Sequence, residues 1–404
     1  MNTSPDNYDV AIAGAGPAGT SAAIHLAMKG VKVLLVEQKR FPRPKLCGEF
    51  ISPECLQHFQ RLGVGNQMIS AGGATLNQTV FYSQRGRSVN VPTDWFGVNA
   101  RALGLSRAEM DYQLLERARL VGAHVLEDTH AAELLIDRGR VRGLTLKTGN
   151  DVVQLPALVT IDATGRTRAL ARKLSNRDNS QHTSRYNLVA FKSHLENTRV
   201  TEGACEIYFY PGGYGGLSNV EGGATNFCFI TAAKDVRRYA SDPEAVIRER
   251  VFLNSRAAHT LAAARTLSEW LSVSLESFGR RTLVPADGLM TVGDAAAFID
   301  PFSGSGMLIA LESGELAAQT IINQLEGLRN NAAFEILARQ YRAEYVRKFH
   351  SRLRMCSLLR RAAFVPSFAE AAILFFGISS RLRRRVARTT RPSQNFKTTP
   401  ADGC

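Results

Sequence analysis

Three closely spaced glycines near the start of the chain restrict its fold more than any other feature. The segment YDVAIAGAGPAGTSAAIHLAMKGVKVLLVEQ holds an apolar run (10–13), Gly14, Gly16 and Gly19, a run of small residues (17–28) and a second apolar run (31–36). The apolar runs predict buried strands, and the small residues between them predict a helix. A strand, a glycine turn, a helix and a second strand form the unit that binds dinucleotides.

Each glycine is expected to have its own steric role. Gly14 makes the tight turn, Gly16 lets the backbone approach a pyrophosphate, and Gly19 lets the helix pack closely on the strand. The phosphates would lie at the positive end of the helix, beside Pro17 and Ala18.

Glu37 and Gln38 end the second strand of this unit. A carboxylate there accepts hydrogen bonds from a ribose diol and repels a 2′-phosphate. The pattern therefore favours FAD or NAD over NADP at this loop, and FAD is the predicted cofactor.

A second motif, GDAAAFIDPFSGSGM, occupies residues 293–307. It predicts a strand ending at Gly293 and Asp294, a glycine loop, and a helix starting near Met307. Asp294 offers a carboxylate for a sugar-like hydroxyl. The loop N–H groups and the helix N-terminus suit the N1/C2 oxygen region of a flavin, which gains negative charge on reduction.

Taken together, GAGPAG with Glu37, Arg107, DATGRTR (162–168) and GDAAAFIDPFSGSGM resemble the aromatic-hydroxylase and geranylgeranyl-reductase superfamily of FAD enzymes. The resemblance covers most of residues 8–330. It implies that the ADP half binds at the first glycine loop and Glu37, and that Arg107 lies against the pyrophosphate. It further implies that Asp294 binds the ribityl chain, that the turn from Asp162 to Gly165 touches FAD, and that the isoalloxazine is lined by Pro301, Gly304 and Gly306.

The segment RPKLCGEFISP (43–53) is closer to geranylgeranyl reductases than to small-phenol hydroxylases. Arg43, Cys47 and Gly48 are expected beside the cofactor. Three roles stay open for Cys47: a redox partner whose thiol pKa is lowered by neighbouring cations, a wall of the substrate pocket, or a loop residue next to the close backbone approach at Gly48. Lys45 and Glu49 are expected to be solvated charges, with acid–base chemistry as the alternative.

The predicted fold is α/β: a Rossmann-type FAD-binding domain with a parallel sheet, like that of p-hydroxybenzoate hydroxylase, an inserted antiparallel substrate sheet and a C-terminal helical region. The expected boundaries are 1–45, 99–170 and 280–330 for the FAD-binding domain, 46–98 and 171–279 for the substrate domain, and 331–404 for the helical region. Six aromatic residues mark the substrate sheet, either as a wall for a flat or long apolar substrate or as core packing: Tyr208, Phe209, Tyr210, Tyr214, Phe227 and Phe229.

The net charge of +14 in 404 residues is concentrated at the C-terminus. Residues 342–404 hold fourteen Lys or Arg and three acids, around the apolar stretch AAFVPSFAEAAILFFGISS. Peripheral contact with a membrane surface suits this arrangement better than nucleic acid, which is not expected as a partner. A helix packed on its own domain with solvated arginines is the alternative. The N-terminus shows no leader pattern, so a cytoplasmic protein is expected.

The motifs predict an FAD-dependent oxidoreductase with NADH or NADPH as electron donor. The favoured activity is hydroxylation of a hydrophobic aromatic or isoprenoid-derived metabolite, of the kind met in secondary metabolism, through a flavin C4a-hydroperoxide. A geranylgeranyl-reductase-like reduction of a C=C bond is the alternative. Halogenation is less favoured because the Trp-x-Trp pair of tryptophan halogenases is absent, and a non-catalytic FAD-binding role also ranks lower. No catalytic residue is predicted, and the six scattered cysteines indicate neither a metal site nor a disulfide framework.

Overall fold

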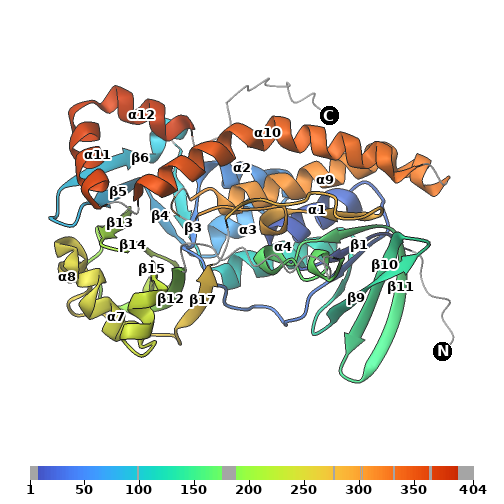
Figure 1. Ribbon diagram of the computed structural model, residues 1–404, viewed down its shortest axis with the longest axis horizontal. Helices are drawn as coiled ribbons and strands as arrows, with labels where there is room; N and C mark the ends of the chain where they lie inside the picture. The colour runs from blue at the N-terminus through green and yellow to red at the C-terminus, as the bar shows by residue number, and fades with distance from the viewer. Residues whose placement is uncertain are drawn as a thin grey trace.

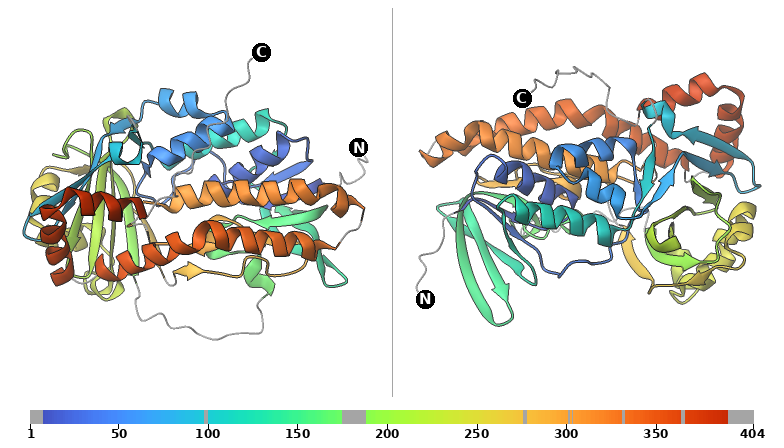
Figure 2. Two further views of the ribbon diagram at one scale, coloured as in Figure 1. Left: turned by 90° about the horizontal axis from the view of Figure 1, so that it is seen from above. Right: turned by 180° about the vertical axis from the view of Figure 1, so that it is seen from behind.

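The computed structural model describes residues 8–97, 100–174, 188–275, 278–300, 302, 304–330, 333–363 and 366–389. It has the predicted α/β architecture, with two large sheets side by side along the long axis (Figure 1). Helices α9 and α10 run along that axis, and the helices α11 and α12 end the described chain beside the second sheet (Figure 2).

The first sheet is built around the predicted dinucleotide unit. Its seven strands run in the order β8-β2-β1-β11-β10-β9, with β19 also paired to β11. Their bounds are β1 (Tyr8–Ala13), β2 (Val33–Val36), β8 (His124–Leu126), β9 (His130–Asp137), β10 (Arg140–Thr148), β11 (Asp151–Asp162) and β19 (Leu289–Thr291). The pairs of β1, β2, β8 and β19 are parallel, whereas β9 and β10 are antiparallel additions. All residues of β1 and β2 are buried, as expected for parallel strands covered on both faces.

Helices cover this sheet and form the largest core with it. They are α1 (Pro17–Ala27), α2 (Pro53–Leu62), α3 (Gly65–Ser70), α4 (Arg107–Leu120), α9 (Gly306–Arg329) and α10 (Phe334–Ala363). Leu114, Leu115 and Ala118 of α4 point into this core, as predicted. Residues Cys55, Phe59 and Leu62 of α2 belong to the same core, although the expected boundaries give that segment to the substrate domain.

The second sheet has eight strands in the order β16-β12-β15-β14-β13-β5-β6, with β17 also on β12. Its strands are β5 (Gln78–Tyr82), β6 (Ser88–Pro92), β12 (Leu188–Glu196), β13 (Ala204–Tyr210), β14 (Gly213–Asn219), β15 (Thr225–Ala232), β16 (Arg265–Thr266) and β17 (Leu271–Leu275). Every pair is antiparallel except β13 with β5, which are parallel. Smaller sheets join β3 (Phe50–Ile51), β7 (Ala102–Gly104) and β4 (Ala74–Leu76), and β18 (Gly279–Arg280) with β20 (Ala297–Phe298).

Helices pack on both faces of the second sheet (Figure 1). One face carries α6 (Ala233–Arg238), α7 (Pro243–Glu249) and α8 (Ser255–Leu261), and the other carries α11 (Pro366–Ile378), followed by α12 (Ser380–Thr389). The remaining short helix, α5 (Ala171–Leu174), follows the turn after β11. Within the described part of the chain, no helix combines the length and apolarity needed to cross a membrane.

Candidate active site

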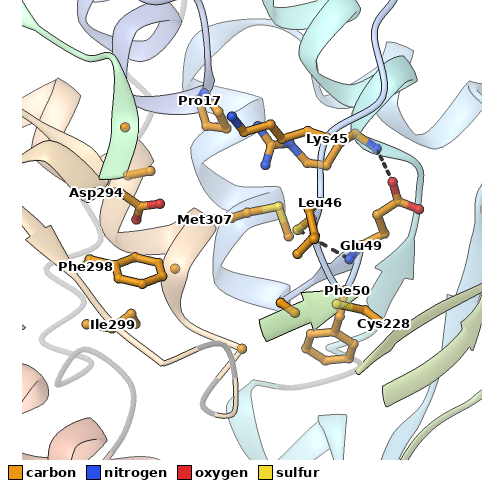
Figure 3. A pocket seen from close by; sticks show the side chains of 18 of the residues that line it. Pro17, Lys45, Leu46, Glu49, Phe50, Cys228, Asp294, Phe298, Ile299 and Met307 are labelled. Carbon is orange, nitrogen blue, oxygen red and sulfur yellow. Dashed lines mark hydrogen bonds between the residues drawn. The ribbon is translucent and has the colours of Figure 1, made fainter. Parts of the chain in front are cut away.

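A cavity of about 960 Å³ runs from the glycine loop after β1 to the second sheet. Ala13, Asp162 and Thr291 are in register at the ends of β1, β11 and β19, so the segments that follow these parallel strands meet at one edge of the sheet. Ligands of such sheets bind at this edge. Figure 3 shows the cavity between Asp294, Phe298 and Ile299 on one side and Lys45, Leu46 and Cys228 on the other.

The glycines of the first loop differ in what a side chain would meet. A Cβ on Gly14, whose φ is +103°, would lie 2.4 Å from the carbonyl oxygen of Ala163, and one on Gly19 would lie 1.9 Å from that of Gly14. Gly16 faces the cavity, and its nearest heavy atom would be Arg107 Nη2 at 4.0 Å. Gly14 and Gly19 are therefore required by the protein's own packing, whereas the space at Gly16 is open to a ligand.

Opposite charges alternate around the phosphate end of the cavity. Glu37 accepts hydrogen bonds from the backbone N–H of Ala15 (3.0 Å) and pairs with Arg43 (3.4 Å). Arg43 also lies 3.6 Å from Asp111, which forms a two-pronged pair with Arg107 at 2.7 and 2.8 Å. Burial would lower the pKa of Arg107, but Asp111 raises it well above its usual range. Asp111 thus fixes the Arg107 guanidinium in place as a cation, with Arg43 beside it.

Lys45 adds a third cation to the same wall. Lys45 is exposed to the open cavity, as expected of a solvated charge, and the partial loss of water there together with Arg107 and Arg43 lowers its pKa. Gly48, three residues later, lines the cavity and would have no heavy atom within 4 Å of a Cβ. Pro17, Ala18 and Gln38 also line this end, where the N-terminus of α1 and the three cations offer a positive surface to an anion.

The second predicted motif lies across the cavity. Asp294 faces inward, and burial raises its pKa to about 6 although Arg107 and Lys45 pull it down. Gly293 has φ +58° and packs so closely on α1 that a Cβ would lie 2.8 Å from that of Ala18. Gly304, Gly306 and Met307 line the cavity at the start of α9, and Gly306 is open, with nothing within 4 Å of a Cβ. Pro301 lies outside the described residues.

The turn after β11 lines the cavity with Gly165, whereas the Asp162 carboxylate points away from the cavity lining and into the turn. Asp162 is buried and accepts hydrogen bonds from the backbone N–H groups of Thr164 (3.0 Å) and Ala171 (2.9 Å). It holds the turn in shape and is not among the residues that line the cavity, whereas Gly165 is. Asp162 therefore has a structural role: it fixes the backbone of the turn that lines the cavity.

Cys47 and Glu49 have different surroundings. Cys47 lines the cavity, and its carbonyl accepts a hydrogen bond from Asn226 (3.2 Å), which ties this loop to the second sheet. Two of its three open roles, pocket wall and loop residue, agree with that position.

The expectation that Glu49 is a solvated charge is wrong. Its side chain is 1% exposed, and it is bonded to Lys192 Nζ (3.0 Å), His194 Nε2 (2.7 Å) and the backbone N–H of Arg107 (2.9 Å). Burial would raise the pKa of Glu49, but the bond from His194 and the charge of Lys192 bring it below 4.5. Lys192 and His194 share one face of β12 with Leu188 and Ala190, and no local pattern predicts that this face meets Glu49.

The aromatic residues of the second sheet divide between its two faces. Phe209 and Tyr214 line the cavity, together with Phe81, Ile207 and Ile230. The other four belong to the core on the opposite face: Tyr208, Tyr210, Phe227 and Phe229. Core packing is confirmed for these four, and Phe209 and Tyr214 have the position that a substrate wall requires, because successive strand residues point to opposite faces.

A buried phenol and a carboxylate join the second sheet to the loop before α9. The Tyr214 hydroxyl donates to Asp300, which also accepts from the backbone N–H of Phe302 (3.0 Å). Burial and the neighbouring carboxylate raise the pKa of Tyr214 well above 10, so its hydroxyl proton stays in place at neutral pH. Neither residue's partner was predicted, because 86 residues separate them.

These residues fit FAD. The open glycines Gly16, Gly48 and Gly306 allow close backbone approach, the cations suit a pyrophosphate, and Glu37 and Asp294 provide carboxylates for ribose and ribityl hydroxyls. Beyond this end, the cavity is walled mainly by aliphatic and aromatic side chains. The site can hold a dinucleotide next to an apolar substrate.

Comparison with known proteins agrees with this site. The family model described as FAD binding domain matches residues 7–345. The menaquinone reductase of Mycolicibacterium smegmatis is 27% identical over 392 residues, which are 92% of this chain and 89% of the relative. The digeranylgeranylglycerophospholipid reductase of Methanosarcina mazei is 28% identical over 323 residues, 78% and 75% of the two chains. Among solved structures, the flavin-dependent brominase Bmp2 matches with a TM-score of 0.81 at 21% identity, over 95% of this chain and 93% of that one.

Proposed function

Because this chain belongs to the FAD binding domain family and is an FAD-dependent oxidoreductase of the geranylgeranyl reductase and aromatic hydroxylase superfamily, we propose that it reduces a C=C bond in an isoprenoid-type lipid. The observation that carries this proposal is the apolar chamber at the second-sheet end of the cavity. Its walls come from Phe81, Phe209 and Ile230 on the sheet and from Ile373 and Phe376 on α11. Such walls favour a long apolar substrate over one that needs many polar contacts.

The protein's own groups would position the substrate and keep water out. When bound, reduced FAD supplies the hydride for one carbon of the double bond, and a proton added to the other carbon completes the reduction. The cations and the N-terminus of α1 would hold the phosphates of FAD, and Asp294 would face its ribityl hydroxyls. Tyr214 keeps its proton on Oη through Asp300 and holds the loop against the sheet. NADH or NADPH remains the proposed source of electrons.

The relatives support a lipid substrate by their names. One is named as a reductase of menaquinone and the other as a reductase of digeranylgeranylglycerophospholipid, and each is matched over three quarters or more of its length. Hydroxylation of an aromatic or isoprenoid-derived metabolite, which the sequence favoured, remains a prediction that the same assay tests.

The experiment uses holoenzyme reduced with dithionite under anaerobic conditions, so that the natural electron donor need not be known. Menaquinone and a digeranylgeranyl glycerophospholipid are offered in detergent micelles, and products are identified by mass spectrometry. After any quinol has been reoxidised in air, a gain of the mass of two hydrogen atoms per reduced double bond is expected, located in the isoprenoid chain by fragmentation and without added oxygen. A product that forms only in air and carries an added oxygen atom would replace this proposal with hydroxylation, and a product halogenated in the presence of halide would replace it with halogenation.

A matched pair of variants locates the substrate. Ala372 lines the chamber from α11, whereas its neighbour Ala371 is exposed on the same helix. Ala372→Trp should keep FAD and lose turnover because the indole fills the chamber, and Ala371→Trp should keep both. Equal turnover by the two variants would place the substrate elsewhere.

A further inference from the structure

Helices α11 and α12 form a wall one helix thick between the apolar chamber and the outside. The wall consists of residues 366–389 and lies at the end of the molecule opposite β9 and β10 (Figure 1). Its inner side lines the cavity with Ala369, Ala372, Ile373 and Phe376 of α11 and with Arg383, Val386 and Ala387 of α12. Ala369 and Ile373 are buried in the core of the second sheet, so the wall is packed on the protein.

The outer side of α11 is apolar and exposed. Leu374 is 48% exposed, Phe375 58% and Ile378 85%. Residues spaced by three or four share one face of a helix, so these three form a single apolar ridge. The acid of this helix, Glu370, is engaged at the other end by the backbone N–H of Arg85 (3.3 Å).

The outer side of α12 is basic. Arg381, Arg384, Arg385 and Arg388 are exposed at helical spacing, and the sequence of α12 contains no acid. The helix is oriented by Trp95, because Arg388 donates to its carbonyl oxygen (3.0 Å) and Arg383 lies 5.4 Å from its ring centroid. The apolar ridge and the row of arginines therefore lie on two adjoining helices at the same end of the molecule.

We propose that this outer surface docks on an anionic lipid bilayer. Exposed apolar side chains beside arginines are the composition of an interfacial helix, which buries its apolar ridge at the headgroup boundary while its cations meet anionic lipids. A nucleic acid would use the arginines but would leave Phe375 and Ile378 in water. A bilayer uses both features, and this complementarity selects it as the partner.

Docking would also place the chamber next to the source of its substrate. The same two helices line the chamber on their inner side, so an isoprenoid lipid in the bilayer would lie one helix away from it. This second step rests on the proposed function, whereas docking itself does not.

The test is flotation of full-length holoenzyme with vesicles of phosphatidylcholine, alone or mixed with phosphatidylglycerol. Wild-type protein should float with the anionic vesicles and much less with the neutral ones. Arg384→Gln with Arg385→Gln should weaken binding to anionic vesicles by about fivefold per arginine. Phe375→Ser with Ile378→Ser should weaken it by about tenfold or more because the apolar ridge is lost.

Two controls keep this test independent of folding. Arg138→Gln with Lys147→Gln removes the same charge from exposed positions in and beside β10, at the other end of the molecule, and should float like wild type. Arg384→Lys with Arg385→Lys keeps the charge and should also float. FAD content and melting temperature are measured for every variant.

The proposal is overturned if wild-type protein stays unbound to anionic vesicles, or if the arginine-to-glutamine variant floats as well as the control. It is also overturned if sedimentation shows a dimer that Phe375→Ser with Ile378→Ser converts to monomer, since the surface would then belong to a second copy. Turnover in detergent is measured separately. Loss of flotation without loss of detergent turnover therefore concerns docking alone, and absence of turnover with intact flotation concerns the proposed function alone.

Discussion

Replacing Gly16 by serine should separate FAD binding from folding. Gly16 has φ −73° and ψ −179°, an extended conformation that any residue adopts, and it caps the N-terminus of α1. Serine is at least as good as glycine at this position, so the stability of the apoprotein should change by less than about 0.5 kcal/mol. The new side chain would point into the cavity, where only Arg107 comes as near as 4.0 Å to the Cβ.

The expected effect on FAD follows from the volume that serine adds. Overpacking a close contact costs about 1–3 kcal/mol, which corresponds to about 5- to 150-fold weaker binding. Titration of apoprotein with FAD, followed by flavin fluorescence, measures this change. Thermal unfolding of the same apoprotein measures stability.

Gly14→Ser is the matched control, because it adds the same atoms two residues earlier. Its backbone has φ +103°, which costs a residue with a side chain about 1–2 kcal/mol, and its Cβ would lie 2.4 Å from a backbone oxygen, which adds about 1–3 kcal/mol. At about 2.1 cal/mol/K of unfolding entropy per residue, a loss of about 2–5 kcal/mol lowers the apoprotein melting temperature by about 2–6 °C. If Gly16→Ser binds FAD like wild type, or if Gly14→Ser melts like wild type, the division of the glycines into ligand-facing and packing positions is refuted.

Three further predictions concern the site's carboxylates and their partners. Burial raises the pKa of Asp294 from 3.8 to about 6, so wild-type apoprotein should lose stability relative to Asp294→Asn as pH rises from 3.8 to 6. Above pH 6 the difference in stability should stay constant. Melting temperatures of both apoproteins against pH measure this difference, and a difference that does not change with pH would contradict the prediction. Tyr214→Phe removes the hydroxyl that donates to Asp300 and should cost about 1–3 kcal/mol in denaturant unfolding, and an unchanged midpoint would show that this bond contributes nothing. Glu49→Gln leaves Lys192 without its buried counter-charge and should cost about 3–5 kcal/mol at neutral pH. Because the pKa of Glu49 is lowered, this deficit should shrink as pH falls below 4.5, and a deficit that persists in acid would point to packing instead of charge.

The first glycine loop could be located from sequence because its determinants are local. Gly14, Gly16, Gly19 and Glu37 lie within one βαβ unit, and each residue's role follows from its place in that unit. Asp294 could be placed because it follows a strand that joins the same sheet edge. The residues around Glu49 could not be, since they come from a loop, the start of α4 and the distant strand β12, and no local pattern records which strand residues will face which loop.

The sequence by itself determined the fold class, the cofactor loop and the combination of an apolar stretch with clustered basic residues at the C-terminus. These follow from local rules: strand and helix periodicity, the steric needs of a glycine turn, and the clustering of charge along the chain. Only the tertiary structure decided that Asp162 supports a turn, that two of six sheet aromatics face the cavity, and that α11 and α12 close the chamber with one side and expose an apolar and basic surface on the other. The physical reason is that a side chain's environment depends on which face of its element is covered, and that is decided by strand pairing and helix packing between segments far apart in the chain.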